Sequence, residues 1–435
     1  MKINFVTVFC FFLAILSFFL IFHRLDNPLS INKTSFFYFL IPAIFFILSI
    51  VSLLLSKKNL FLFFYTLIVI IFISYSVESF FKFIIYPDIY KARKTYFEKN
   101  NFDIRNKFEI FDEIEKKKLD KTISVPPQNF LSNDDKKILP LSGLSNKMTI
   151  TCNESGYFGS YFSDRYGFNN NNKIYDEDEI FSIFIGDSFV NGYCVNNQNN
   201  LISSLQSKNF FKEKNILNLG FGGNGPLLSY ATLKEYYNKN KNTKYVFWLY
   251  YEPNDLIELS REIKDPILSK YLKNPSYSQS LILKQKEVDF IINEKIQNEK
   301  FEFNQNLIQS KNKLITFLSL DETRRYIFKL INSSIKKDKV IIDLFSTIVK
   351  NFKNFSNKEN FELIFIYLPG KEVNEGSLYY EDIVSLINRE KIKLIDLSNS
   401  NFYKKNDFYP KYGGHFNEKG YEELSIKIHN KLSHM

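Results

Sequence analysis

Three nearly unbroken apolar runs at the start of the chain constrain its fold more than any other feature. The runs are Ile3–Phe22, Ser35–Leu55 and Leu60–Tyr75, and the third extends toward Phe81. A helix needs roughly 20 apolar residues to cross the hydrocarbon of a membrane, and each run is close to that length. We therefore predict a membrane anchor in residues 1–85, with three transmembrane helices at about 3–22, 35–55 and 60–81.

The orientation of this anchor follows from the basic residues beside the runs. A cleaved signal peptide is the alternative for the first run, but the bulky Phe22–Leu25 offers no small-residue cleavage site. Lys2 and Lys57-Lys58 mark the N-terminus and the second turn as cytoplasmic, although basic residues in the first loop and after the third run weaken this bias. Three crossings then place the rest of the chain outside. We predict a bacterial inner-membrane protein with the residues after the anchor on the periplasmic side.

The net charge of +10 raises the question of nucleic-acid binding. The lysines are scattered along the chain, and they form no basic stripe flanked by glycine or aromatic residues. We therefore predict no nucleic-acid partner. Attraction to anionic lipid headgroups is the more plausible consequence of the excess charge.

The residues after the anchor divide into a connecting stretch and one large domain. Residues 86–150 read as a stalk and connecting segment, and residues 151–435 alternate between strand and helix patterns. Such alternation is typical of an α/β fold in which helices cover both faces of a parallel sheet, in three layers. The pattern is interrupted at about 256–355 by a largely helical insertion, which predicts a lid or a partner surface. The expected strands are Ile180–Ile185, Ile216–Leu219, Tyr245–Tyr251, Phe361–Leu368 and Lys393–Leu397.

A candidate nucleophile follows the first of these strands, in Gly186-Asp187-Ser188. Ligands of open α/β sheets bind at the carboxyl ends of the strands, so a serine there would face a crevice from a rigid support. Taken alone, the tripeptide also fits an ordinary polar turn.

Three later loops after strands contain side chains that a serine nucleophile needs. The glycine-rich loop around Gly223 allows backbone N–H groups to approach a ligand, and the amide of Asn254 can donate to a developing oxyanion. His415 is the one histidine of four that lies in a glycine-rich loop just past the last strand, where it can act as a base. Each loop alone also fits an ordinary turn.

Taken together, Ser188, Gly223, Asn254 and His415 resemble the four sequence blocks that give the SGNH (GDSL-type) hydrolase family its name. The resemblance covers roughly residues 150–255 and 360–435, and it implies the SGNH fold with a three-layer flavodoxin-like parallel sheet. It also implies that Ser188 attacks an ester carbonyl and that His415 transfers the serine proton. The Ser188 N–H, the Gly223 N–H and the Asn254 side chain would form the oxyanion hole.

One feature of the family pattern is missing. The family usually has an acid three, or sometimes two, residues before the histidine, where this chain has Tyr412 and Gly413. The sequence leaves open whether Asp407 or Asp396 takes this place, whether a backbone carbonyl does so, or whether activity is weak or absent.

Three functions remain after these observations. The first is an ester hydrolase that removes an O-acyl group from an envelope glycan or lipid through an acyl-serine intermediate. The second is an O-acyltransferase for a cell-surface polysaccharide, with a membrane-integral partner as acyl donor. The third is a catalytically silent glycan-binding protein of the same fold. We predict no cofactor and no metal, because the histidines and cysteines are few and dispersed.

The cysteines fit an oxidising compartment. Cys10 lies within the first apolar run, whereas Cys152 and Cys194 form an even set in the predicted periplasmic part. We predict a disulfide between these two, which would join the start of the domain to the loop beside Ser188. The alternative is a pair of buried free thiols.

Overall fold

The computed structural model describes most of the chain, and it divides into two compact units. Residues outside the description are 1–4, 25–32, 86–88, 135, 311–316, 319, 321, 325, 328–337, 372–377 and 434–435. The start of the first predicted span and of the predicted stalk therefore lie outside the described residues. Unit 1 comprises Met1–Arg93 and Gln305–Ile335, and unit 2 comprises Lys94–Asn304 and Lys336–Met435.

Unit 1 consists mainly of apolar helices. Among the described residues, a single helix, Lys57–Phe83, has the length and hydropathy of a membrane crossing. Phe5–Phe19 and Ala43–Leu54 are apolar helices of shorter length. The three-span anchor therefore stays a prediction. The helices are α1 (Phe5–Arg24), α2 (Lys33–Leu54) and α3 (Lys57–Phe80), and α3 continues into a π-helical turn, Phe81–Ile85.

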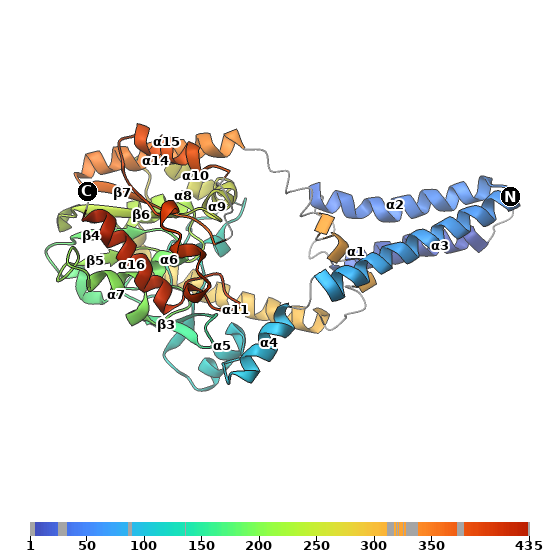
Figure 1. The fold of residues 1–435 in the computed structure, drawn as a ribbon, viewed down its shortest axis with the longest axis horizontal. Coiled ribbons are helices and arrows are strands. Elements are labelled where there is room, and N and C mark those ends of the chain that lie inside the picture. Colours follow the sequence, from blue (N-terminus) through green and yellow to red (C-terminus); the bar gives the residue numbers. More distant parts are fainter. Residues whose placement is uncertain are drawn as a thin grey trace. The chain divides into compact units, whose positions relative to one another are not determined.

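A parallel sheet of five strands forms the centre of unit 2, and it confirms the predicted α/β class (Figure 1). Its strand order is β5-β4-β6-β7-β8, and every neighbouring pair is parallel. In chain order this is 2-1-3-4-5, an arrangement whose order reverses beside the first strand. The strands, which confirm the five predicted ones, are β4 (Ser182–Ile185), β5 (Ile216–Asn218), β6 (Tyr245–Tyr251), β7 (Glu362–Leu368) and β8 (Lys393–Asp396).

Alternating residues of the strands feed two apolar cores, one on each face of the sheet. Ile183 of β4 belongs to one core and Phe184 to the other, because successive side chains of a strand point to opposite faces. The first core includes residues of α8 (Pro226–Tyr236), α9 (Asp255–Glu262), α10 (Pro266–Lys273), α11 (Gln285–Ser310), α14 (Lys339–Glu359) and α15 (Tyr380–Arg389). The second includes residues of α7 (Leu201–Gln206) and α16 (Glu418–Leu432). The predicted three layers are therefore present.

A second, three-stranded sheet precedes the large one in the chain. It consists of β1 (Lys121–Ile123), β2 (Met148–Asn153) and β3 (Phe158–Phe162). Strand β2 pairs in parallel with β1 and antiparallel with β3. The turn between β2 and β3 therefore belongs to a hairpin outside the five-stranded sheet.

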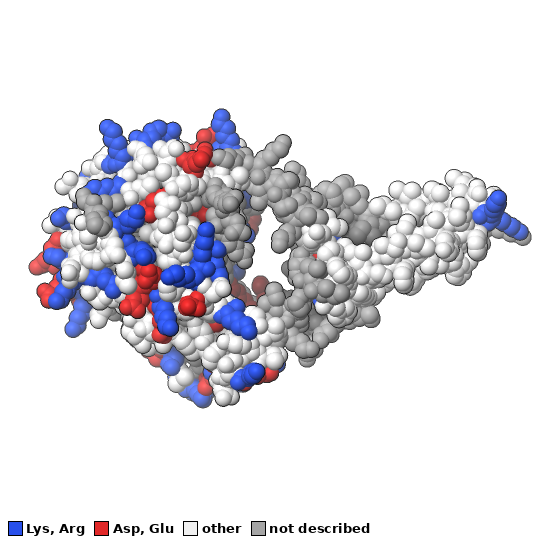
Figure 2. All heavy atoms as spheres, viewed as in Figure 1, with Lys and Arg blue, Asp and Glu red and all other residues white. Residues whose placement is uncertain are grey.

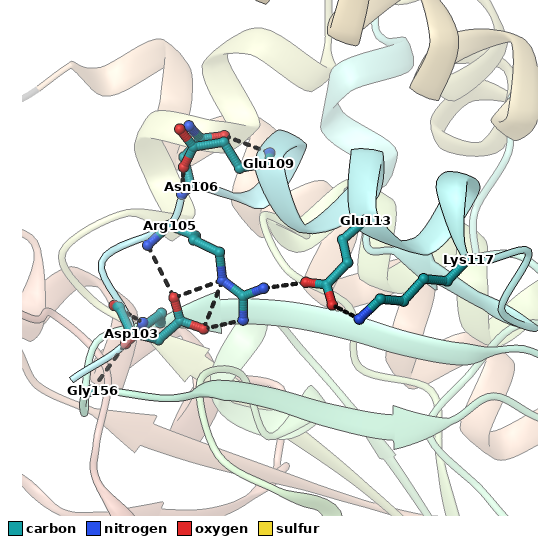
Figure 3. Close-up of polar contacts among 8 residues, drawn as sticks. Asp103, Arg105, Asn106, Glu109, Glu113, Lys117 and Gly156 are labelled. Atoms are coloured by element: carbon teal, nitrogen blue, oxygen red, sulfur yellow. Dashed lines mark hydrogen bonds and ion pairs between the residues drawn. The ribbon is translucent and has the colours of Figure 1, made fainter. Parts of the chain in front are cut away.

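This hairpin turn is fastened by the segment that leads into helix α5 (Lys107–Lys116) (Figure 3). The Asp103 amide donates to the Gly156 carbonyl at 2.9 Å, and the Asn153 side chain donates to the Asp103 carbonyl at 2.7 Å. Arg105 pairs with the carboxylates of Asp103 and Glu113. These exposed ion pairs contribute little free energy individually, but the backbone bonds fix where the turn lies.

Charged side chains of both signs are interspersed on the face of unit 2 drawn in Figure 2. The described part of unit 1 on the same face carries few charges, apart from a basic group at one end.

Candidate active site

Ser188 begins a short helix, α6 (Ser188–Asn191), directly after β4. The turn into it passes so close to β6 that a Cβ on Gly186, whose φ is +148°, would lie 2.7 Å from the Leu249 carbonyl oxygen. The Asp187 carboxylate caps the helix by accepting from the Phe189 amide at 3.0 Å. Because β4 lies between β5 and β6, Ser188 lies where the strand order reverses, which is the usual ligand position in such sheets.

The structure brings His415 to Ser188 across the carboxyl edge of the sheet. The loop after β8 carries His415, and its Nε2 lies 3.0 Å from the Ser188 Oγ. The rings of Phe189 and Tyr193 each lie 5.7 Å from the imidazole. Two of the side chains predicted to act together are thus within hydrogen-bonding distance, with the hydroxyl in reach of the base.

The acid beside the histidine is Glu154, which the sequence analysis did not identify. Its Oε1 lies 2.9 Å from His415 Nδ1, and its Oε2 accepts from the His415 amide at 2.9 Å. Glu154 directly follows β2, in the hairpin turn, and so comes from the opposite end of the domain sequence. The sequence contained one indirect signal that Glu154 lies near Ser188. Cys152, two residues before Glu154, was predicted to form a disulfide with Cys194, which lies in the loop beyond Ser188.

The predicted acids Asp407 and Asp396 do not bond to His415. Asp396 Oδ2 instead accepts from the Tyr380 hydroxyl at 2.5 Å, and its Oδ1 accepts from the Ser398 amide at 2.8 Å. The backbone carbonyl of Asp407 accepts from the Asn417 side chain at 2.8 Å, which helps to shape the start of α16. Both predictions were wrong because closeness in sequence does not decide which carboxylate the fold brings to the ring.

Burial and hydrogen bonding act in opposite directions on Glu154. Burial alone would raise the pKa of its carboxyl group, but the hydrogen bond to the His415 ring, the charge of that ring and the His415 amide together lower the pKa below the usual 4.5. The ionised form is therefore favoured. A carboxylate at this position orients the imidazole and stabilises it when it becomes positively charged.

Cys152 and Cys194 form a disulfide, as the sequence predicted. The disulfide joins the hairpin that carries Glu154 to the loop beyond α6. The Cys194 sulfur also lies 3.4 Å from His415 Nδ1. One potential ligand atom from each of Cys152, Glu154, Cys194 and His415 lies within 4.8 Å of the others. In the disulfide form the sulfurs are not thiolates, which are the species that bind metal ions.

The three predicted oxyanion-hole residues follow β4, β5 and β6 in neighbouring positions. Gly223 has a φ of +72°, and a Cβ there would lie 2.3 Å from the Gln128 side chain. The amides of Ser188 and Gly223 donate to no acceptor in the described part of the chain. Asn254 Nδ2 lies 3.4 Å from Asp187 Oδ2, while its Oδ1 is buried without a partner among the described residues. The backbone amides of Ser188 and Gly223 thus remain available as donors.

Two buried acids, Asp187 and Asp255, adjoin Asn254, the first through its hydrogen bond and the second as the next residue in the chain. Burial raises the pKa of Asp187 to about 6, although the Phe189 amide and His415 oppose the shift. Burial also raises the pKa of Asp255 well above its usual value, and repulsion from Asp187 adds to this effect. At neutral pH Asp187 is mostly ionised, and its carboxylate attracts the Asn254 amide.

Glu262 supports the loop that contains Gly223. Its two carboxylate oxygens accept from the amides of Gly225 at 2.7 Å and Leu227 at 2.8 Å, at the start of α8. Burial raises the pKa of Glu262 to about 8, while these hydrogen bonds favour its ionised form. The contacts tie helix α9 to the loop after β5, two residues beyond Gly223.

A hollow of about 410 Å³ opens on the side of Glu154. Glu154 contributes to the lining of this hollow but Ser188 does not, and Ser188 is itself buried, with 7% of its surface exposed. The hollow is lined by aromatic rings together with charged and amide groups, which suits a polar ligand with apolar faces. Its lining includes Tyr96, Phe102, Tyr157, Tyr409, Lys411 and Asn417.

Comparison with known proteins identified no family for this chain. No protein-family model matches the sequence. No curated protein matches it either.

Proposed function

We propose that this chain is a membrane-anchored serine ester hydrolase of the SGNH type and fold, held in a bacterial inner membrane with unit 2 on the periplasmic side. The observation that carries the proposal is the line of hydrogen bonds from Glu154 through His415 to Ser188. Acid, imidazole and hydroxyl in this order are what a serine nucleophile requires, whatever their order in the sequence.

The reaction proceeds in two halves. The Ser188 oxygen attacks the ester carbonyl while His415 Nε2 takes the hydroxyl proton. Collapse of the tetrahedral intermediate breaks the bond to the alcohol, which leaves with the proton from His415, and an acyl-serine remains. Water then attacks the acyl-serine in the same way, which releases the carboxylic acid and restores the hydroxyl. Glu154 stays ionised throughout, because its role is to orient and stabilise the imidazolium.

The negative charge of the intermediate would be stabilised by the Ser188 amide, the Gly223 amide and the Asn254 side chain. The two amides have no competing acceptor among the residues described, and Gly223 has a positive φ that a residue with a side chain rarely adopts. One donor of this kind typically contributes about 3–4 kcal/mol to the stability of the transition state.

The substrate class that fits best is an O-acyl group on an envelope glycan or lipid. Sugars present polar hydroxyls and apolar ring faces, and the hollow beside Glu154 combines aromatic rings with polar groups. A membrane anchor would also keep the enzyme at the surface where envelope molecules are found.

The test is hydrolysis of acetyl and longer-chain p-nitrophenyl esters by the full chain in detergent, compared with Ser188→Ala and His415→Ala. Ser207→Ala is a matched control, because this serine caps the C-terminal end of α7 and bonds to the Ser204 carbonyl. We expect both site variants to lose turnover and the control to keep it. Equal rates for wild type and Ser188→Ala would reject the proposal.

Mass spectrometry of the stopped reaction should find the acyl group on the peptide that contains Ser188. Adding an acetylated glycan and a free glycan as acceptor separates hydrolysis from transfer. Ester formation on the acceptor in preference to release of free acid would reassign the reaction to an acyltransferase with the same nucleophile.

The topology has its own test, which is independent of activity. A reporter enzyme that folds only in the periplasm, fused after residue 435, should be active. An inactive reporter with an active cytoplasmic counterpart would reverse the proposed orientation.

A further inference from the structure

The disulfide next to the catalytic histidine lies within a set of groups that are good zinc ligands. Cys152 and Cys194 contribute sulfur, Glu154 a carboxylate oxygen and His415 a ring nitrogen, all within 4.8 Å of one another. Zinc binds thiolate, imidazole and carboxylate ligands in a tetrahedral arrangement. While the disulfide is intact, its two sulfurs are bonded to each other, so this set is complete only after reduction.

We propose that reduction of the Cys152–Cys194 disulfide converts this side of the active site into a zinc site, with Cys152, Glu154, Cys194 and His415 Nδ1 as ligands. The site itself depends only on the observed geometry. Its consequence for catalysis rests on the proposed esterase function.

The distances suit such a site with only small movements. In a tetrahedral zinc site with these ligands, neighbouring ligand atoms lie about 3.3–3.8 Å apart, from the usual bond lengths. The Cys194 sulfur is already 3.4 Å from His415 Nδ1, and Glu154 Oε1 is 2.9 Å from the same nitrogen. Breaking the disulfide lets the two sulfurs separate to that spacing.

The backbone around these ligands is held independently of the disulfide. The β2–β3 ladder and the bond from Asp103 to Gly156 fix the hairpin that bears Cys152 and Glu154. The Cys194 amide lies 3.4 Å from the Thr151 hydroxyl, and the Tyr421 hydroxyl donates to the Tyr193 carbonyl at 3.2 Å. The four groups can therefore remain close together once the sulfurs are reduced.

An external dithiol supplies the electrons and protons that reduce the disulfide. Two electrons and two protons pass from the dithiol to the disulfide, which yields two protein thiols and an oxidised dithiol. Zinc binding then displaces both thiol protons, because the thiolate is the ligand. The imidazole also gives up any proton on Nδ1, and the carboxylate of Glu154 binds as it is.

Zinc at this position would stop the proposed catalysis through the histidine tautomer. A neutral imidazole with a metal on Nδ1 carries its proton on Nε2. Nε2 is the atom that lies 3.0 Å from the Ser188 hydroxyl, so it would become a donor and could no longer accept the serine proton. Glu154 would at the same time be withdrawn from the ring. Reduction in the presence of zinc should therefore switch the enzyme off, and reoxidation should restore it.

The test uses the full chain in detergent, with a phosphine reductant, which does not bind zinc through a thiol of its own. Zinc bound after gel filtration is measured in oxidised protein, in reduced protein and in the reduced double variant Cys152→Ser, Cys194→Ser. Cobalt replaces zinc in a second series, because a thiolate-to-cobalt charge-transfer absorption identifies the sulfur ligands. Ester turnover is followed in the same samples.

We expect one zinc per chain in the reduced wild type only, a thiolate-to-cobalt band in that sample alone, and turnover that falls with zinc and returns with a chelator. Equal zinc in reduced wild type and double variant would overturn the proposal. Loss of the fold on reduction, seen by circular dichroism, would also overturn it. Because zinc content and the cobalt band do not depend on turnover, a protein that binds the metal but cleaves no ester would contradict the proposed function alone.

Discussion

Glu154 Oε1 lies 2.9 Å from His415 Nδ1, although 261 residues separate the two in the chain. The same carboxylate also accepts from the backbone amide of His415, so it fixes both the ring and the loop that carries it. This two-point contact supplies a carboxylate to the ring, although Tyr412 and Gly413 shortly before the histidine provide none. The missing acid therefore does not argue for a silent protein.

Replacing this carboxylate by an amide should sharply reduce activity. We expect Glu154→Gln to lower kcat by about 10²–10⁴-fold, because a neutral amide cannot stabilise the imidazolium and favours the wrong tautomer. Steady-state hydrolysis of p-nitrophenyl acetate measures the effect. Asp407→Asn, at the position first expected to supply the acid, is the control and should keep the wild-type kcat. An equal loss in both variants would contradict the role given to Glu154.

The stability of unit 2 should depend on pH through Asp187. Burial raises the pKa of Asp187 from 3.8 to about 6 in the folded protein. The folded state therefore binds the Asp187 proton more tightly than the unfolded chain does. The protonated carboxyl group adds to the free energy of unfolding at low pH, and this contribution is lost as the pH rises through about 6. Relative to Asp187→Asn, the wild type should lose at most about 3 kcal/mol between pH 4 and 7.

Urea unfolding followed by tryptophan fluorescence measures this difference, because Trp248 is the one tryptophan and is buried in the core of unit 2 against Phe352. Comparing how the free energy of unfolding changes with pH in the two proteins removes any effect of the substitution that is the same at every pH. A difference that stays flat from pH 4 to 7 would show that Asp187 does not carry the raised pKa.

Gly223 should tolerate no side chain. Alanine there combines an unfavourable positive φ of +72° with a Cβ placed 2.3 Å from Gln128. We expect Gly223→Ala to reduce kcat about 10²-fold or more, because the amide that would serve the oxyanion is displaced. The double variant Gly223→Ala, Gln128→Ala removes the collision but not the backbone strain, so it should recover only part of the loss. Full recovery would mean that crowding alone matters.

Glu262 should act as a positioning residue for the same loop. Glu262→Ala leaves the amides of Gly225 and Leu227 without their acceptors, at a cost of about 1–3 kcal/mol for each buried donor. Both the urea midpoint and kcat should fall, while Glu262→Gln, which keeps one acceptor oxygen, should be intermediate.

Glu258→Ala, one turn earlier on α9, supplies the matched control for this series. Glu258 is also buried, but it bonds to the exposed Arg261 and not to the amides of the Gly223 loop, so its loss should lower stability less than the loss of Glu262 and change kcat little. Similar losses in the Glu258 and Glu262 variants would assign the effect to helix α9 as a whole.

The sequence alone predicted the elements whose signal is local. Short apolar runs alternating with helical patterns identified all five strands of the parallel sheet. Ser188 and His415 were identified because each stands in a glycine-containing loop after a predicted strand, where the topology of parallel sheets places ligand-binding residues.

Only the tertiary structure decided which acid serves His415, and how the loop of Gly223 is supported. Glu154 comes from a hairpin in a separate sheet, and Glu262 reaches its partners from another helix, so neither contact leaves a periodic or short-range trace in the sequence. Asp407 and Asp396 were favoured because they lie close to His415 in the sequence. Closeness in sequence does not determine which carboxylate reaches the ring. The physical reason is that a hydrogen bond depends on where the packed elements place two atoms, and that is set by the whole fold.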